Sequence, residues 1–184
     1  MAEIVAETER LVLRRELPGD IAVWLEHMNT PEVMEKVGGV QSPEQVAESF
    51  AKMAAADGPM SFHLLALKAD GQLIGKCGLA LIETPVAPDE LKGAAQVGWT
   101  LRADCWGRGY AREAAEAALA LAFERLDLPC VYAQTSQRNL ASWGLMERLG
   151  MRRRADLDYP DPEYPPEDNP TMVYSISREE WSGA

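Results

Sequence analysis

The spacing of hydrophobic and polar positions changes repeatedly along the chain, and each change predicts an element of secondary structure. Alternating or short apolar runs predict strands over residues 10–16, 94–101, 130–135 and 171–177, and two apolar-rich runs within residues 62–83 predict two more strands. Apolar residues spaced for one buried face predict helices over 20–28, 42–55, 111–126 and 139–149. This order predicts a mixed α/β fold (α+β), with a mostly antiparallel sheet flanked by helices.

Local signals mark where several of these elements begin and end. Ser42 precedes a proline and stands three residues before Gln45, which predicts a capping box at the start of the second helix. Gly150 follows the helix over 139–149 and suits a left-handed C-terminal cap. The segment DLDYPDPEYPPEDNP, residues 156–170, carries six acidic residues and five prolines, so it is predicted to be an extended loop.

An Asp-Gly pair at 70–71 predicts a tight hairpin between the two longest apolar runs. A two-residue turn there would pair Leu64 with Cys77 and His63 with Gly78. Neighbouring residues of a strand point to opposite faces, so His63 and Cys77 are expected on opposite faces of the sheet. This register argues against a covalent mechanism that uses a cysteine and a histidine.

Charge and composition narrow the class of protein. Lys and Arg number 18 and Asp and Glu number 29, so the net charge is −11, which argues against nucleic-acid binding. The acidity fits either a cationic acceptor or a device for solubility. Three widely spaced cysteines without a CxxC pair indicate a reduced compartment and no metal site.

Length and hydropathy set the remaining bounds. The 184 residues are enough for one domain, over residues 1–184. The sequence shows no apolar run of membrane-spanning length and no secretion signal at its start, so we expect a cytoplasmic protein with no membrane partner.

The segment CWGRGYAREAA, residues 105–115, places two glycines before a predicted helix. A glycine loop at a helix start directs several main-chain N–H groups at one point, which makes an anion site. Gly107 and Gly109 remove side chains there, and Arg108 and Arg112 add positive charge. A tight turn without a ligand is the alternative. The segment lacks the P-loop pattern and the third glycine of the dinucleotide-binding motif.

Two stretches, VGWTLRADCWGRGYAREA and NLASWGLMERLGM, together resemble the GNAT superfamily of acyl-CoA-dependent N-acyltransferases. The likeness is greatest to the branch that acetylates the N-terminal amines of ribosomal proteins and related amines. Trp106, Gly109 and Ala111 occupy the fixed positions of the superfamily signature Gln/Arg-x-x-Gly-x-Gly/Ala. Trp106 departs from the first position, a substitution that is usual in this branch.

The resemblance implies a GNAT fold and assigns residues to coenzyme A. The main-chain amides expected to hold its pyrophosphate are those of Gly107, Arg108, Gly109, Tyr110, Ala111 and Arg112. The residues expected to offer main-chain groups to the pantetheine arm are Thr100, Leu101 and Arg102. Asn139 and Ser142 match the helix positions that face the cofactor from the far side.

Two departures affect the expected chemistry. Many relatives place a glutamate base where this chain has Gln96, and a tyrosine proton donor where it has Met146. Ser142 is the remaining candidate for the proton donor, or else it only forms a hydrogen bond to the cofactor. The base stays open among Glu83, Asp89, Glu90 and the acids of residues 156–168.

The resemblance therefore predicts an enzyme that transfers an acetyl group from acetyl-CoA to a primary amine by direct attack. The acceptor is a protein N-terminus or a small-molecule amine, and the loop over 156–170 either lines the acceptor groove or is a solvated connector. The loss of both usual proton-transfer groups leaves a non-catalytic acyl-CoA sensor as an alternative, and a general nucleotide-binding module as a weaker one. A homodimer is also open, because no apolar stripe identifies an interface.

Overall fold

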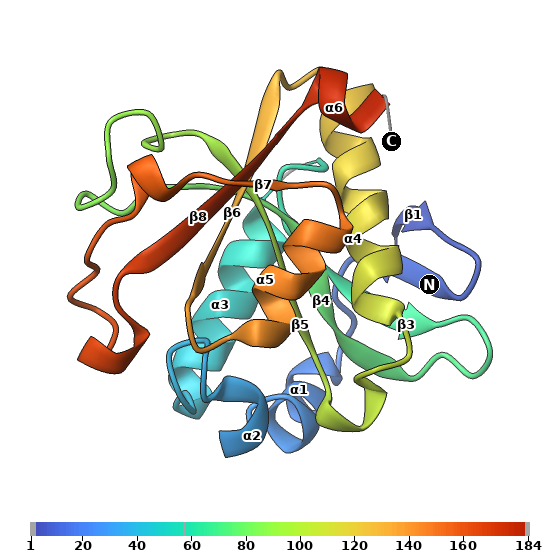
Figure 1. The fold of residues 1–184 in the computed structure, drawn as a ribbon. Coiled ribbons are helices and arrows are strands. Elements are labelled where there is room, and N and C mark those ends of the chain that lie inside the picture. The colour runs from blue at the N-terminus through green and yellow to red at the C-terminus, as the bar shows by residue number, and fades with distance from the viewer. Residues whose placement is uncertain (1–2, 57, 183–184) are drawn as a thin grey trace.

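The structure, a computed structural model, describes residues 3–56 and 58–182, and within them eight strands form one sheet. Its order is β1-β2-β3-β4-β5-β6-β8-β7, and neighbours are antiparallel except for the parallel pair β5 and β6 (Figure 1). The strands are β1 (Ile4–Glu7), β2 (Leu11–Arg14), β3 (Phe62–Leu67), β4 (Leu73–Leu81), β5 (Ala95–Leu101), β6 (Cys130–Ser136), β7 (Arg152–Arg153) and β8 (Thr171–Ser177). The predicted mixed, mostly antiparallel sheet is confirmed.

Helices cover both faces of this sheet (Figure 1). Apolar residues of α4 and α5 join the sheet in the main core, whereas α1 and α3 close a second core on the other face. The helices are α1 (Asp20–His27), α2 (Pro31–Met34), α3 (Pro43–Ala55), α4 (Tyr110–Ala120), α5 (Leu140–Arg148) and α6 (Arg178–Ser182). The π-helical segment η2 (Leu121–Arg125) continues α4 and completes the predicted length of that helix.

The capping box predicted for α3 is present in full. Gln45 N–H donates to the Ser42 hydroxyl at 3.2 Å, and Ser42 N–H donates to the Gln45 side chain at 2.8 Å. Gly150 adopts a φ of +81° after α5, as a left-handed cap requires. These local predictions succeed because each depends on a few adjacent residues.

The predicted hairpin register is wrong by one residue. The structure pairs His63 with Cys77 and Phe62 with Gly78, because the turn uses four residues, 68–71, and β4 then holds an extra residue near Gly75 as a bulge. His63 and Cys77 therefore face the same side of the sheet. A thiol mechanism is still disfavoured, since Cys77 is 0% exposed and burial raises the pKa of its thiol to about 12.

The sheet opens at its centre. A single residue pair, Gln96 with Tyr132, joins β5 to β6, whereas seven pairs join β4 to β5 along its whole length. Beyond Gln96 the two strands separate, so the second half of β5 keeps one edge that pairs with no strand among the described residues. This opening lies between the two halves of the sheet and positions the site.

None of the helices in the described ranges is both long and apolar enough to cross a membrane.

Candidate active site

The glycine loop leads from the end of β5, through the short helical turn η1 (Ala103–Cys105), into α4. Gly107 and Gly109 have φ values of +73° and +81°, and Gly109 is the N-cap of α4. No main-chain acceptor within the described residues takes the N–H groups from Gly107 to Arg112. These donors gather at the positive end of the helix dipole, so the loop has the structure of an anion site.

Arg10 holds this loop from outside, a role that the sequence did not reveal. Its guanidinium donates to the Arg108 carbonyl at 2.9 Å, forms an ion pair with Glu113 at 2.7 Å and lies 4.6 Å from the centre of the Tyr110 ring. The main-chain N–H of Arg10 also donates to Glu113 at 2.7 Å. The Arg108 carbonyl is therefore turned to Arg10, which leaves the N–H side of the loop available to a ligand.

The open edge of β5 supplies further main-chain groups. Arg102 N–H donates to the Ile74 carbonyl at 2.9 Å, which fixes the phase of pairing with β4. Because that pairing alternates along a strand, Trp99 and Leu101 direct their main-chain groups to the opposite, open edge. The Trp106 indole already donates to the Leu101 carbonyl at 2.9 Å, so the N–H of Leu101 and both groups of Trp99 are available.

This geometry separates the roles of the three residues at the end of β5 that are predicted to meet the pantetheine arm, Thr100, Leu101 and Arg102. Thr100 pairs with Lys76 of β4, and its side chain faces a cavity. Arg102 uses its main chain for Ile74 and Cys105 and its side chain for Asp104. Leu101 retains one available N–H, and Trp99, to which the family resemblance assigns no role, adds two groups.

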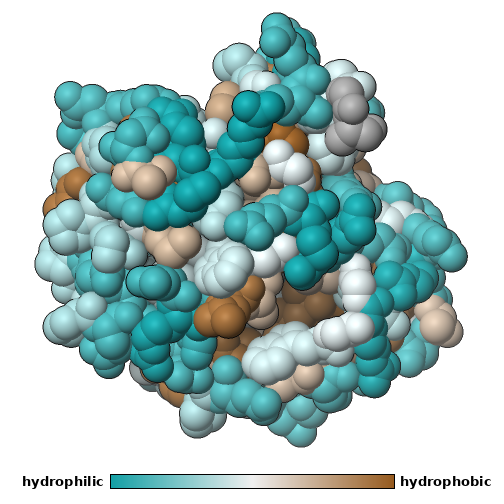
Figure 2. Space-filling model, viewed as in Figure 1, coloured by the Kyte–Doolittle hydropathy of each residue, from teal (hydrophilic) through white to brown (hydrophobic). Residues whose placement is uncertain are grey.

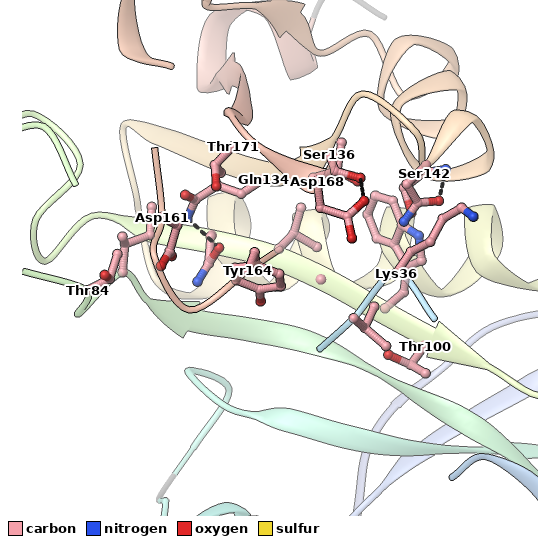
Figure 3. Close-up of a pocket in the computed structure, with 18 of the residues that line it drawn as sticks. Lys36, Thr84, Thr100, Gln134, Ser136, Ser142, Asp161, Tyr164, Asp168 and Thr171 are labelled. Carbon is pink, nitrogen blue, oxygen red and sulfur yellow. Dashed lines mark hydrogen bonds between the residues drawn. The ribbon is translucent and has the colours of Figure 1, made fainter. Parts of the chain in front are cut away.

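A cavity of about 460 Å³ lies where β5 and β6 separate. Figure 3 shows polar side chains of this cavity, which come from β5, β6, α5, the residues just after α2 and the segment before β8. In Figure 2 the surface between α5 and the start of α4 is hollowed, with apolar side chains at the floor and more hydrophilic ones around it. A volume of this size is ordinary for a small-molecule site.

The predicted residues of α5 line this cavity. Asn139 is the N-cap of α5, and its side-chain oxygen accepts from Ser142 N–H at 3.4 Å. Ser142 presents its hydroxyl on the cavity wall, together with Asn139 and Thr100. The six residues from Gly107 to Arg112 form a separate group at the start of α4, outside the cavity lining.

Gln96 and Met146, which replace the usual base and donor, also line the cavity. The Gln134 side-chain N–H donates to the Gln96 oxygen at 2.9 Å, and the Tyr159 hydroxyl donates to the Gln134 oxygen. Burial raises the pKa of Tyr159 to about 12, so its hydroxyl keeps its proton at neutral pH. The hydrogen-bonded row of Gln96, Gln134 and Tyr159 is therefore uncharged, and none of its groups can serve as the general base.

The acidic residues considered for the general base fall into two groups, those outside the cavity and those on its wall. Asp89 pairs with Lys92, and Glu90 pairs with Arg154 and accepts from Tyr132, so neither lines the cavity. The carboxylates on the cavity wall are Glu83, Asp161, Glu163 and Asp168. The segment over 156–170 is irregular, as predicted, apart from the short turns η3 (Ala155–Leu157) and η4 (Pro166–Asp168).

Asp168 is the carboxylate tied most directly to the α5 side of the cavity. It is 6% exposed, accepts from the Ser136 hydroxyl at 3.1 Å and lies 3.5 Å from the Arg138 guanidinium. Ser136 is also joined to the N-cap of α5, because its carbonyl accepts from Asn139 N–H at 3.1 Å. The position of Asp168 depends on packing between β6, α5 and η4, which no local motif signals.

Comparison with known proteins identifies the family. The sequence model of the acetyltransferase (GNAT) domain matches residues 10–152. The chain belongs to the GNAT family. The uncharacterized N-acetyltransferase p20 of Bacillus licheniformis is 26% identical over 158 residues, which cover 83% of this chain and 85% of that protein. As a GNAT protein, this chain is an acyl-CoA-dependent N-acetyltransferase.

Solved structures agree with the GNAT fold. A GNAT-family acetyltransferase from Bacillus anthracis superposes with a TM-score of 0.77 at 23% identity, over 96% of this chain and 99% of that one. Spermidine N-acetyltransferase from Vibrio cholerae, solved with CoA and spermine, gives 0.72 at 18% identity, over 94% and 98%. At these identities the structures show a shared fold.

Proposed function

We propose that acetyl-CoA binds with its pyrophosphate on the glycine loop and its pantetheine arm along the open edge of β5, and that a primary amine enters the cavity. One observation carries this assignment. The available N–H groups from Gly107 to Arg112 follow directly after a strand edge whose own main-chain groups, at Trp99 and Leu101, have no partner strand among the described residues. An open strand edge followed directly by an anion site matches coenzyme A, in which the amide-bearing pantetheine arm continues into the pyrophosphate.

In the proposed reaction, the acceptor nitrogen attacks the thioester carbon, a C–N bond forms and the C–S bond breaks. Sulfur leaves as a thiolate and the nitrogen loses one proton. Main-chain N–H groups at the open edge of β5 would stabilise negative charge on the carbonyl oxygen. Holding the two reactants together provides much of the acceleration, so few side chains need to react.

Two side chains are proposed for the protons. Asp168 accepts the proton of the acceptor amine, because it is a carboxylate held on the cavity wall by Ser136 and Arg138. Ser142 gives its proton to the departing sulfur and regains one from water, because it is the hydroxyl of α5 that lines the cavity. Gln96 then orients the acceptor by hydrogen bonding, as part of the neutral chain with Gln134 and Tyr159.

We further propose that the whole chain is one catalytic domain of the branch that acetylates N-terminal amines, that it acts in the cytoplasm and that no metal takes part. A homodimer remains compatible with this assignment. The neighbour that holds spermine supports an amine acceptor of small size. The neutral residues Gln96 and Met146 on the cavity wall are the observation that favours the second candidate, an acyl-CoA sensor without turnover.

The experiment is a screen of small amines and N-terminal peptides with acetyl-CoA, in which free thiol is detected. Calorimetry with CoA, ATP and NAD accompanies it. Binding of CoA with amine-dependent thiol release is the expected result. Binding without release for any amine would support the sensor, and equal binding of ATP or NAD would remove the specific assignment of the loop.

A further inference from the structure

Lys76, in the middle of β4, is a partly buried lysine on the wall of the cavity. Within the described residues its ammonium has no carboxylate partner and no hydrogen-bond acceptor. Its neighbours are two aromatic rings, with the nitrogen 5.1 Å from the centre of the Trp24 ring and 5.2 Å from that of Phe62. Its cross-strand partner Thr100 also faces the cavity.

An ammonium that is partly removed from water without a counter-ion is unfavourable, and desolvation lowers the pKa of Lys76. The two rings attract the cation, but their faces do not replace the hydrogen bonds that its three N–H donors make in water. The other lysine of the cavity, Lys36, differs because Glu35 lies 3.3 Å from its nitrogen. Among the described residues nothing completes the charge of Lys76, and an anionic group of a molecule in the cavity would do so.

Three of the four cavity carboxylates, Asp161, Glu163 and Asp168, lie on another wall, whereas the fourth, Glu83, follows the end of β4. Asp161 and Asp168 belong to the segment before β8, whereas Lys76 belongs to β4, on the other side of the opening between β5 and β6. Figure 3 shows the acidic residues on that segment and Thr100 on the strand across the cavity. The cavity thus has an acidic wall, formed by these three carboxylates, and the Lys76 ammonium across from it, and its volume of about 460 Å³ suits one small molecule.

We propose that Lys76 binds a carboxylate of the acceptor, and that the acceptor is a small dipolar amine of the amino-acid class. This inference rests on the proposed function. The ammonium end of such a molecule meets the acidic wall and loses one proton to water to become the free amine. Asp168 then takes the second proton as the nitrogen attacks the thioester. The carboxylate end meets Lys76. A polyamine has no group that would complete the charge of Lys76, so it is expected to be a poor acceptor.

The test compares the common amino acids with their matched amides and decarboxylated amines as acceptors, by thiol release from acetyl-CoA. Three proteins are used: the unaltered chain, K76M, which replaces the ammonium with an apolar group of similar length, and K76R, which keeps the charge. For the unaltered chain, kcat/KM is expected to be about 10- to 100-fold higher for the best amino acid than for its amide, the effect of one charged hydrogen bond. In K76M this ratio falls to about one, and in K76R most of it remains.

Three results would overturn the inference: amides or decarboxylated amines that serve as well as the acids, no amino acid that serves at all, or a ratio that K76M leaves intact. The acceptor series on the unaltered chain is decisive even if K76M does not fold. Calorimetry with CoA separates this failure from failure of the proposed function. A chain that binds CoA and acetylates amines without regard to a carboxylate refutes only the role of Lys76, whereas a chain that does not bind CoA refutes the proposed function.

Discussion

Substitution of Gly109 by valine tests the anion site directly. Gly109 has a φ of +81°, a region that costs a residue with a side chain roughly 1–3 kcal/mol. The added Cβ would lie 3.3 Å from the Arg10 guanidinium, which is the flexible end of a side chain and can move. For a chain of this length, that strain corresponds to a fall in Tm of about 2–12 °C, so the variant is expected to fold.

Binding of CoA is expected to fall much further than stability. The strained turn and the valine side chain displace the N–H groups that meet the pyrophosphate, and each lost hydrogen bond to a charged oxygen weakens binding about 10- to 100-fold. Calorimetric titration with CoA measures the Kd, and thermal unfolding measures the Tm. Loss of one bond or two therefore predicts an increase in Kd of at least about tenfold.

Gly71→Val is the matched control. Gly71 has a φ of +75°, no atom lies within 4 Å of an added Cβ, and the residue belongs to the β3–β4 turn rather than the loop. It therefore carries the same backbone strain without altering the N–H groups at α4. If the two variants bind CoA equally well, the glycine loop does not hold the coenzyme and the proposed site is wrong.

Three further predictions concern single side chains. Burial would raise the pKa of Glu113, but the hydrogen bonds that its carboxylate accepts from Thr8 and the Arg10 main chain outweigh burial and lower the pKa. The ionised side chain therefore stabilises the fold above about pH 4.5, and this contribution is lost as the pH falls through the lowered pKa. Urea unfolding should show that E113Q is less stable than the unaltered chain at about pH 7 and equally stable at about pH 3. A constant difference at both values would contradict this. Burial raises the pKa of the Cys77 thiol to about 12, so Cys77 should not react with iodoacetamide in the folded protein, whereas the partly exposed Cys130 should react. Peptide mass mapping measures both reactions, and labelling of Cys77 at the rate of a free thiol would refute its burial. S142A should lower kcat about 100-fold with little change in the KM for acetyl-CoA, whereas a change confined to KM would show that Ser142 only binds the coenzyme.

The sequence predicts those parts of the fold that depend on neighbouring residues. The capping box at Ser42, the glycine cap at Gly150 and the helix after Gly109 all appear in the structure. The hairpin register failed because a four-residue turn and a bulge near Gly75 are set by tertiary pairing with β5 as well as by the turn residues. Strand β1, helix α2 and strand β7 are short, so their patterns were too brief to indicate an element.

The site was predictable only in part for a related reason. Its glycine loop is one continuous segment and carries its own signal. The positions of Arg10 against Glu113, of Lys76 beneath Trp24 and of Asp168 against Ser136 each join residues from elements that lie far apart in the chain. Such contacts follow from the order of strands in the sheet, which periodicity does not specify.

The lone pairing of Gln96 with Tyr132 has a consequence for how a substrate changes the protein. In an ordinary sheet the middle strands exchange their amide hydrogens most slowly, since they are bonded on both sides. Here the two middle strands, β5 and β6, are joined by one residue pair only. The pantetheine arm of coenzyme A, bound along β5, would take the place of a neighbouring strand. Bound acetyl-CoA would then act as a ninth strand of the sheet. The folded enzyme would therefore be most stable when the coenzyme is bound.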